Sequence, residues 1–511
     1  MNPSTKVLIV GAGPTGLVLA LWLTRLGIPV RIVDRAAEPG TTSRALAVQV
    51  RTLEFYRQIG IADGVIAGGA KIEAVNFWVQ GEQAARVTFR RLGEQQTPYP
   101  FALVYPQDAH ERFMIEQLGA AGVRVERETE LVRFDRHAGG VRATLVRPDG
   151  TEDFCDAAYL AACDGASSTV REGLAIGFPG GTYEGVFYVA DVEVAGPIED
   201  DELHVDLEEA DFVLLFPMRG KGRVRLVGLV REPPDGVDSD LTFEDVRGRA
   251  VDNLRLDVAK VNWFSTYRVH HRVASKFRDG RVFLLGDAAH IHSPVGGQGM
   301  NTGIGDAVNL AWKLAAVLEG EAPEALLDTY EPERIAFARR LVATTDRVFT
   351  VVTRRGPVAR FVRTRLVPLL APWLFRLPPV RRFLFRTVSQ IGVRYPESAL
   401  SVGEAGKIRG GDRLPWVETG SGEDNFAPLT SLTWQVHVYG RAPAGIGPVC
   451  SDLGLSLHVF AWRPGMRRAG FEKGALYLIR PDGYVAMADP EADPRRLRSY
   501  LGATLGVPSG S

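Results

Sequence analysis

At 511 residues the chain is too long for one hydrophobic core, so about two to four domains are expected. With 45% hydrophobic and 24% charged residues it is a globular protein, and a net charge of −1 argues against a general nucleic-acid binder. Three scattered cysteines, Cys155, Cys163 and Cys450, have neither CxxC nor zinc-ligand spacing, so we expect a reducing compartment, the cytoplasm.

The N-terminal segment has the pattern of a β-α-β unit. KVLIV (6–10) predicts a buried strand, GAGPTG a turn, LVLALWLTRLG a helix that ends at Gly27, and VRIVD (30–34) the next strand. Glycines and a proline interrupt this apolar run, which argues against a signal peptide. No uninterrupted apolar stretch is long enough to span a bilayer, so no stable membrane insertion is expected.

The middle of the chain alternates helix and strand patterns. Apolar spacing predicts a helix over 106–119, and the following segment predicts hairpin strands with turns at HAGG and PDG. Residues 176–275 are expected to be rich in strands, including a hairpin over 212–230 around RGKG. FLLGD then predicts a buried strand, and DAVNLAWKLAAVLEG a long helix.

Helices broken by prolines are expected over 341–390. The segment 351–390 has nine arginines and no acidic residue. Packed helices with outward-facing arginines are favoured there over a membrane-surface or partner role. From about residue 400 a glycine-rich linker precedes strands, a hairpin and a final helix, which predicts a small α/β domain.

The clearest chemical signal is the glycine pattern of the first turn. Gly11 allows a tight turn, Gly13 lets the backbone approach a pyrophosphate, and Gly16 lets the helix pack closely on the strand. A pyrophosphate would bind at the positive end of the helix. Asp34 ends the second strand, where its carboxylate can accept from ribose hydroxyls. The pattern predicts dinucleotide binding and fits NAD and FAD equally.

A second stretch, GDAAHIHSPVGGQGMN (286–301), combines an acid, two histidines and several glycines. No third and fourth ligand with recognisable spacing accompany His290 and His292, so no metal site is expected. Acid–base work by one of these histidines is one interpretation, and a structural histidine is the leading one. No GxSxG surrounds Ser293, which argues against a hydrolase.

Three motifs in order, GAGPTG, CDGASSTVR (163–171) and GDAAHIHSPVGGQGMN, resemble the fingerprints of the flavin-dependent aromatic hydroxylases, the para-hydroxybenzoate hydroxylase family. SRALAVQVRTLEFYRQIGI (43–61) and YPQDAHERF (105–113) match this family too, so the resemblance covers about residues 5 to 345. The C-terminal part, with YLIRPDGYVA, looks like the subgroup that acts on phenols and aromatic polyketides and ends in a thioredoxin-like domain.

The resemblance implies an α/β fold with discontinuous domains. A Rossmann-type FAD-binding domain is expected over 1–70, 101–175 and 276–345, with an inserted β-sheet substrate domain over 71–100 and 176–275. A helical segment and linker are expected over 346–400. The thioredoxin-like domain is expected over 401–511, and because it lacks CxxC it cannot perform dithiol chemistry.

The resemblance also assigns roles to single residues. Asp34, with Arg35 beside the adenosine, is expected to hold the ADP half of FAD, and the family usually has Glu where this chain has Asp34. Pro294 is expected between flavin and substrate, with His292 as a catalytic candidate and Phe216 as a candidate pocket wall. The expected FAD-binding residues are Gly11, Gly13, Gly16, Asp34, Arg35, Arg44, Gln107, Asp164, Gly286, Asp287, Gly297, Gly299, Met300 and Asn301.

The implied activity is hydroxylation of a phenolic or polyketide-type aromatic, with NADPH or NADH as a transient co-substrate. O2 would react through a flavin C4a-hydroperoxide, and the cofactor would carry the difficult chemistry. Baeyer–Villiger oxidation, epoxidation or drug inactivation on the same fold is the alternative, and a ligand-binding flavoprotein without catalysis is a third interpretation. A monomer or homodimer is expected, and the missing WxWxIP signature argues against a halogenase.

Overall fold

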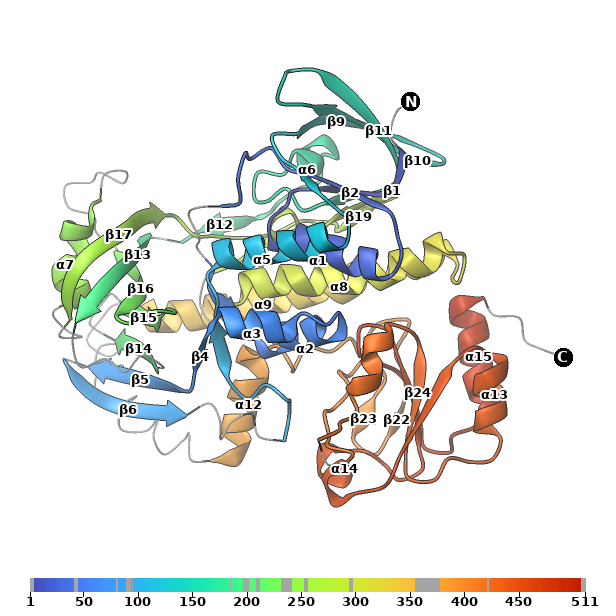
Figure 1. Cartoon of the computed structure of the whole chain (residues 1–511). Coiled ribbons are helices and arrows are strands. Elements are labelled where there is room, and N and C mark those ends of the chain that lie inside the picture. The colour runs from blue at the N-terminus through green and yellow to red at the C-terminus, as the bar shows by residue number, and fades with distance from the viewer. Residues whose placement is uncertain are drawn as a thin grey trace.

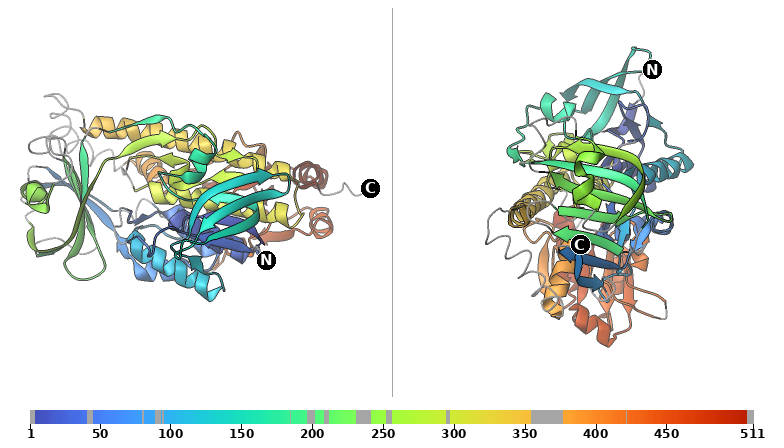
Figure 2. Two further views of the ribbon diagram at one scale, coloured as in Figure 1. Left: turned by 90° about the horizontal axis from the view of Figure 1, so that it is seen from above. Right: turned by 90° about the vertical axis from the view of Figure 1, so that its left-hand side faces the viewer.

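The computed structural model describes residues 4–40, 45–79, 81–88, 93, 95–183, 185–195, 202–207, 212–230, 241–251, 256–293, 297–353, 377–420 and 422–506. Within these ranges we find no helix with both the length and the apolar character needed to cross a bilayer. Figures 1 and 2 show a central body, a second sheet at one end, and a C-terminal unit on the other side.

The central sheet of eight strands has the order β19-β20-β11-β1-β2-β8, and β10 and β9 extend it from β11 as an antiparallel hairpin. β1 pairs in parallel with both β2 and β11, and β11 pairs in parallel with β20. Strands buried on both faces form continuous apolar runs. The strands are β1 (Ser4–Val10), β2 (Val30–Val33), β8 (Val125–Glu126), β9 (Glu130–His137), β10 (Gly140–Val146), β11 (Glu152–Ala162), β19 (Arg278–Asp279) and β20 (Val282–Leu284).

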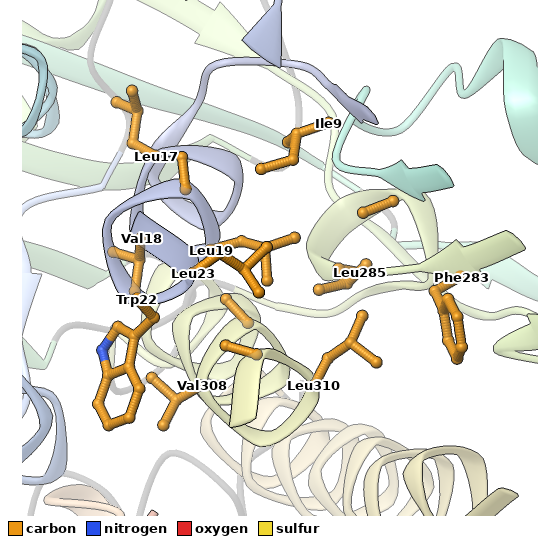
Figure 3. Close-up of a cluster of buried hydrophobic side chains, with 14 of the residues drawn as sticks. Ile9, Leu17, Val18, Leu19, Trp22, Leu23, Phe283, Leu285, Val308 and Leu310 are labelled. Atoms are coloured by element: carbon orange, nitrogen blue, oxygen red, sulfur yellow. The ribbon is translucent and has the colours of Figure 1, made fainter. Parts of the chain in front are cut away.

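Two buried helices pack together beside this sheet. In Figure 3, Leu19 and Leu23 of α1 lie close to Val308 and Leu310 of α8, and all four side chains are buried in one cluster. Because α1 has apolar residues on every face, it packs against both the sheet and α8. The helices of the central body are α1 (Pro14–Arg25), α2 (Val50–Gln58), α3 (Ala62–Gly68), α5 (Gln107–Ala120), α6 (Thr169–Gly173), α8 (Gly299–Leu318) and α9 (Tyr330–Thr353).

The second sheet, called the side sheet below, has the order β17-β13-β16-β15-β14-β5-β6. Its strands are β5 (Ala74–Val79), β6 (Glu82–Thr88), β13 (Val186–Ala195), β14 (Glu202–Leu207), β15 (Phe212–Pro217), β16 (Arg223–Val230) and β17 (Asp257–Tyr267). The predicted hairpin around RGKG is confirmed, since β15 and β16 pair antiparallel across it. The sequence did not predict α7 (Phe243–Val251), a helix within the strand-rich region that packs on one face of this sheet.

Two short three-stranded sheets connect these bodies. One has the order β12-β18-β21 and the other β3-β7-β4. Their strands are β3 (Ala47–Val48), β4 (Ala70–Ile72), β7 (Ala102–Val104), β12 (Gly180–Thr182), β18 (His270–Val273) and β21 (His290–Ile291).

The C-terminal unit is a six-stranded sheet of order β23-β22-β27-β26-β24-β25 with helices. A parallel β24-α13-β25 unit is followed by antiparallel β26 and β27 and then α15, which is the arrangement of a thioredoxin-like fold. α12 (Pro378–Val388) precedes this unit and packs on the central body, where Phe385 clusters with Val50. The elements of the unit are β22 (Val402–Ala405), β23 (Ile408–Arg409), β24 (Gln435–Tyr439), α13 (Ile446–Asp452), β25 (Ser456–Phe460), α14 (Pro464–Ala469), β26 (Leu476–Ile479), β27 (Val485–Asp489) and α15 (Pro494–Leu505).

Candidate functional site

The glycine turn after β1 has the geometry that its sequence predicts. Gly11 has φ +101°, and a Cβ there would lie 2.2 Å from the carbonyl oxygen of Cys163. A Cβ on Gly16 would lie 2.0 Å from the carbonyl oxygen of Gly11, so strand and helix are in direct backbone contact. A Cβ on Gly13 would meet nothing within 4 Å. The backbone of Gly13 is therefore open in its Cβ direction, whereas Gly11 and Gly16 are in close backbone contact in theirs.

The positive end of α1 follows this open backbone. Gly13 is the N-cap residue, no side chain caps the helix, and the first backbone bond runs from the Leu17 amide to the Gly13 carbonyl. The amides of Thr15 and Gly16 precede that bond. Uncapped amides at a helix N-terminus favour anionic oxygens, so this turn fits a pyrophosphate.

Asp34 lies at the end of β2, beside the same turn. Its Oδ2 accepts from the Ala12 amide at 2.6 Å and its Oδ1 from the Ala36 amide at 2.8 Å. Arg127 lies 3.7 Å away through Nη1, and Arg35 is exposed. A carboxylate offers about four acceptor sites, so the two backbone bonds leave acceptor capacity on Asp34 for sugar hydroxyls.

The second motif packs against the first, and one carboxylate oxygen of its Asp164 caps the start of α6. Asp164 Oδ2 accepts from the Val170 amide at 3.2 Å at the start of α6. Asp164 Oδ1 is buried without a hydrogen-bond partner among the described residues, and burial raises the pKa of this carboxyl group. A buried oxygen without a partner is costly, so Asp164 Oδ1 fits a hydroxyl donor of a bound cofactor.

The third motif lies against the start of α1. Gly286 has φ +58°, and a Cβ there would lie 2.7 Å from Thr15 Oγ1 of α1. The Arg171 guanidinium donates to the carbonyl oxygens of Ala288 and Ala166, which ties the second motif to the third. The three motifs, separated by more than a hundred residues in sequence, therefore meet around the N-terminus of α1.

The glycine-rich end of the third motif leads into α8. Gly297 has φ +61°, and Gly299 is the first residue of the helix. The Thr302 amide donates to the Gln298 carbonyl, so the amides of Gly299, Met300 and Asn301 precede that bond. α8 has no side-chain cap at Gln298. This second positive helix end fits a group that gains negative charge.

Asn301 has a role that sequence reasoning did not foresee. Its Oδ1 accepts from the Gln49 amide and from Thr52 Oγ1, each at 2.8 Å. Its Nδ2 donates to the carbonyl oxygens of Ala47 and Gly297. Because the protein uses both donors and both acceptors, the Asn301 side chain fixes α2 against α8 and leaves only its backbone amide for a ligand.

The two histidines have different surroundings. His290 Nε2 lies 2.7 Å from Asp306 Oδ2 in a fully buried pair. His292 Nδ1 donates to the Ser293 carbonyl at 2.9 Å, and burial lowers the pKa of His292 to about 4. His292 is therefore neutral near pH 7, and its Nε2 is a buried acceptor that has no partner among the described residues.

For the other predicted site residues the structure gives fewer contacts or none. Arg44 and Pro294 lie outside the described residues. Asp287 is exposed in a single 3-10 turn over 286–288. Gln107 begins α5 and donates from Nε2 to Glu111 at 2.8 Å. Glu111, which the sequence did not single out, is buried, and burial raises its pKa although the Gly40 amide also donates to it.

The side sheet turns an apolar face toward the central body. Leu214 and Phe216 of β15 are half-buried and cluster with Leu46 and Val104, whereas the alternate residues pack toward α7. β14 has an inverted pattern, because its apolar Leu203 and Val205 are half-buried while its polar His204 and Asp206 are buried. Half-buried apolar side chains on an inner face fit the wall of a site for an apolar ligand. Leu203, Val205, Leu214 and Phe216 are called the apolar wall below.

The converging turns, the two uncapped helix ends and the orphaned Asp164 oxygen define a dinucleotide-binding enzyme of the flavin type. Comparison with known proteins agrees, since residues 4–345 match the family model described as FAD binding domain. The chain belongs to this family.

Individual relatives cover nearly the whole chain. A 6-methylpretetramide 4-monooxygenase of Streptomyces rimosus is 35% identical over 518 residues, which cover 99% of this chain and 88% of the relative. A pentachlorophenol 4-monooxygenase of Sphingobium chlorophenolicum is 35% identical over 361 residues, 70% of this chain and 66% of the relative. The crystal structure of an aklavinone-11 hydroxylase with FAD and aklavinone has a TM-score of 0.79 at 27% identity, covering 99% and 100%. The chain is an FAD-dependent monooxygenase of the aromatic hydroxylase class.

Proposed function

We propose that the enzyme uses NADPH or NADH and O2 to hydroxylate a phenolic or polyketide-type aromatic. The observation that carries this proposal is the convergence of three glycine motifs around one helix N-terminus. The side sheet adds a half-buried apolar face that is turned toward the central body. Bound FAD supplies electron transfer from the nicotinamide cofactor and the activation of O2. The substrates named for the relatives, 6-methylpretetramide, pentachlorophenol and aklavinone, support an aromatic substrate class.

The proposed contacts of FAD follow from the converging turns, the two helix N-termini and the resemblance of the motifs to the family. The α1 turn would hold the pyrophosphate, Asp34 the adenosine ribose, and Asp164 Oδ1 and Asp287 the ribityl hydroxyls. The backbone from Gly297 to Asn301 would lie against the ring. The full proposed set is Gly11, Gly13, Gly16, Asp34, Arg35, Arg44, Gln107, Asp164, Gly286, Asp287, Gly297, Gly299, Met300 and Asn301.

The N-terminus of α8 would stabilise negative charge on the reduced ring. Helix-end amides contribute roughly 0.3–1 kcal/mol when exposed and up to about 2 kcal/mol when partly buried. His292 would add a neutral imidazole acceptor beside this helix end, because a Cβ on Gly299 would lie 3.9 Å from its Nε2. A histidine with a pKa of about 4 accepts a hydrogen bond from a phenol but is a weak base toward it.

The substrate would lie between the ring and the apolar wall. Phe216 is the proposed wall residue that faces the central body, and Pro294 is proposed between ring and substrate. Aromatic side chains bind aromatic ligands through offset or edge contacts as well as area. An apolar pocket with few polar groups excludes water from the oxygen-transfer step.

We also propose how the chain is divided into domains and how it assembles. The FAD-binding domain would comprise 1–70, 101–175 and 276–345, with the substrate domain over 71–100 and 176–275. The helical segment would span 346–400 and the thioredoxin-like domain 401–511. We propose a monomer or homodimer.

The test is flavin content followed by coupled turnover. The purified chain is saturated with FAD, and NADPH and NADH oxidation is followed by the absorbance of the reduced nicotinamide, with a panel of phenols and fused-ring phenolic ketones. We expect at least one aromatic to stimulate oxidation and to return as a hydroxylated product. Folded protein that binds no FAD, or oxidation that no aromatic accelerates, would contradict the proposal.

A further inference from the structure

A chain of buried polar contacts connects the C-terminal domain to the Gly286 turn. It begins at Asp306 in α8, whose carboxylate is fully buried. Asp306 Oδ2 accepts from the Gly286 amide at 3.0 Å and lies 2.7 Å from His290 Nε2, and its Oδ1 accepts from Arg334 Nε at 2.6 Å. One side chain therefore holds the turn of the third motif, a histidine of that motif, and α9.

The electrostatics of Asp306 match this role. Burial alone would raise the pKa of the carboxyl group, but Arg334, His290 and the Gly286 amide hold that pKa below its usual value. The carboxylate is thus charged, and a buried charge needs all of its partners. Displacement of Arg334 would leave a buried anion facing the Gly286 turn.

Arg334 connects Asp306 to the segment that follows α12. Its Nη1 donates to the Tyr395 hydroxyl at 2.8 Å and its Nη2 to the Thr302 carbonyl at 3.0 Å. The preceding residue, Glu333, is buried as completely and accepts from Lys313 of α8 at 2.9 Å and from Ser398 at 2.6 Å. Adjacent residues of α9 thus carry the two halves of one network.

The second half ends in the turn between β26 and β27. Arg480 is fully buried, and its guanidinium donates to both Glu333 oxygens at 2.7 and 3.1 Å. The same guanidinium binds both oxygens of Asp482, at 3.0 and 2.6 Å. Trp312 Nε1 of α8 donates to Asp482 at 3.2 Å. The RPDG turn (480–483) of the C-terminal domain is therefore anchored to α8 and α9 by groups that solvent cannot replace.

We propose that Arg480 and Asp306 are positioning residues for FAD: Arg480 fixes α9 through Glu333, so that Arg334 and Asp306 hold the Gly286 turn in its FAD-binding geometry. The C-terminal domain, which lacks dithiol chemistry, then contributes to cofactor binding through this turn. The inference rests on the proposed placement of the Gly286–Asp287 turn at the cofactor.

A second contact between the same domains provides a control. Arg57 of α2 binds Asp424 of the C-terminal unit through two bonds, at 2.7 and 2.9 Å. This pair crosses the domain boundary as the Arg480 pair does, but it has no contact with Glu333, Arg334 or Asp306. Loss of Arg57 therefore weakens the domain contact and leaves the buried polar chain intact.

The experiment compares FAD affinity among variants of the full chain. Apoprotein is titrated with FAD by fluorescence quenching, and visible circular dichroism of bound flavin reports ring geometry. Arg480→Gln is expected to raise the FAD dissociation constant by about tenfold or more, a coupling of the size found between linked sites. Arg480→Lys should recover part of this loss, and Arg57→Gln should stay within about twofold of the wild type while lowering the melting temperature.

A double variant separates coupling from general damage. If the buried chain transmits the effect, Arg480→Gln and Asp306→Asn together should cost less than the product of their separate fold-changes. Effects that multiply, or an Arg480→Gln protein that binds FAD within about twofold of the wild type, would overturn the inference.

Two further outcomes remain decisive. If Arg480→Gln does not fold, Tyr395→Phe removes one acceptor of Arg334 without removing a charge. A rise of about threefold in the dissociation constant then supports the inference and an unchanged value overturns it. Wild-type protein that binds no FAD would overturn the proposed function as well, whereas tight wild-type binding with an insensitive Arg480 variant would overturn only the positioning role.

Discussion

Substitution of Gly13 separates cofactor binding from folding. Gly13 has φ −77° and ψ −178°, an extended conformation that alanine adopts, and its Cβ would meet nothing within 4 Å. The lower chain entropy of alanine stabilises by about 0.4–1 kcal/mol, while alanine at an N-cap costs about 0.5–1 kcal/mol relative to glycine. The net change in the free energy of unfolding of Gly13→Ala should therefore lie within about 1 kcal/mol of zero.

The FAD affinity of Gly13→Ala should fall although the protein stays folded. The added methyl group occupies the space through which the backbone would contact the pyrophosphate, and a rise in the dissociation constant of about tenfold to a hundredfold, or about 1.4–2.7 kcal/mol, is expected. FAD titration gives the affinity, and thermal unfolding without FAD gives the stability. A folded Gly13→Ala protein with wild-type affinity would refute the backbone contact.

Gly11→Ala is the matched comparison. At φ +101° alanine is strained by about 1–3 kcal/mol, and its Cβ would overlap the Cys163 carbonyl oxygen at 2.2 Å. Overpacking adds about 1–3 kcal/mol, so this variant should lose about 2–6 kcal/mol of stability before FAD is added. Wild-type stability of Gly11→Ala would contradict the described contact between the first two motifs.

Three further substitutions test separate parts of the site. Asp287→Ala should weaken FAD binding by about 1.5–3 kcal/mol, the cost of a charged hydrogen bond; an unchanged dissociation constant would exclude that contact. Phe216→Ala should raise the KM for the aromatic substrate and leave FAD affinity unchanged, which steady-state kinetics and FAD titration would measure. An unchanged KM with a weakened FAD affinity would contradict the role of Phe216 as a pocket wall. Because burial lowers the pKa of His292 from 6.5 to about 4, only the unfolded chain takes up that proton between these values. Stability is therefore lost as pH falls from 6.5 to 4, by roughly 3 kcal/mol, and urea unfolding of His292→Gln should show a correspondingly smaller loss.

The local features of the site could be predicted from the sequence because glycine requirements are local. A positive φ at Gly11 and close packing at Gly16 follow from their places in a strand-turn-helix unit. The strand VRIVD and the helix over 106–119 were likewise predicted, since each has a clear apolar pattern.

The long-range contacts could not be predicted in the same way. Nothing in the sequence pairs Glu333 with Arg480, because these residues lie in different domains and meet only in the folded chain. One signal was available: Asp306, Asn309 and Lys313 share one face of a helix whose other residues from Gly303 to Leu318 are apolar or glycine. Polar residues at that spacing in a buried helix indicate a buried polar network, although the pattern does not identify the partners.

The side sheet shows a different limit of sequence patterns. Leu203 and Val205 are the apolar residues of β14 next to His204 and Asp206, yet the polar pair is the more buried one. The apolar residues stay half-buried because they face the central body rather than α7. The partial exposure of these apolar residues indicates a ligand-facing surface only in combination with the position of the sheet beside the central body.

The most direct test of the account is the origin of the oxygen in the product. The FAD-saturated enzyme is incubated with NADPH, isotopically heavy O2 and the aromatic that best stimulates NADPH oxidation, and the product is analysed by mass spectrometry. We predict one heavy oxygen atom in each product molecule, bound to a ring carbon. A product that carries no heavy oxygen, formed while NADPH is consumed, would contradict a monooxygenase that hydroxylates an aromatic ring.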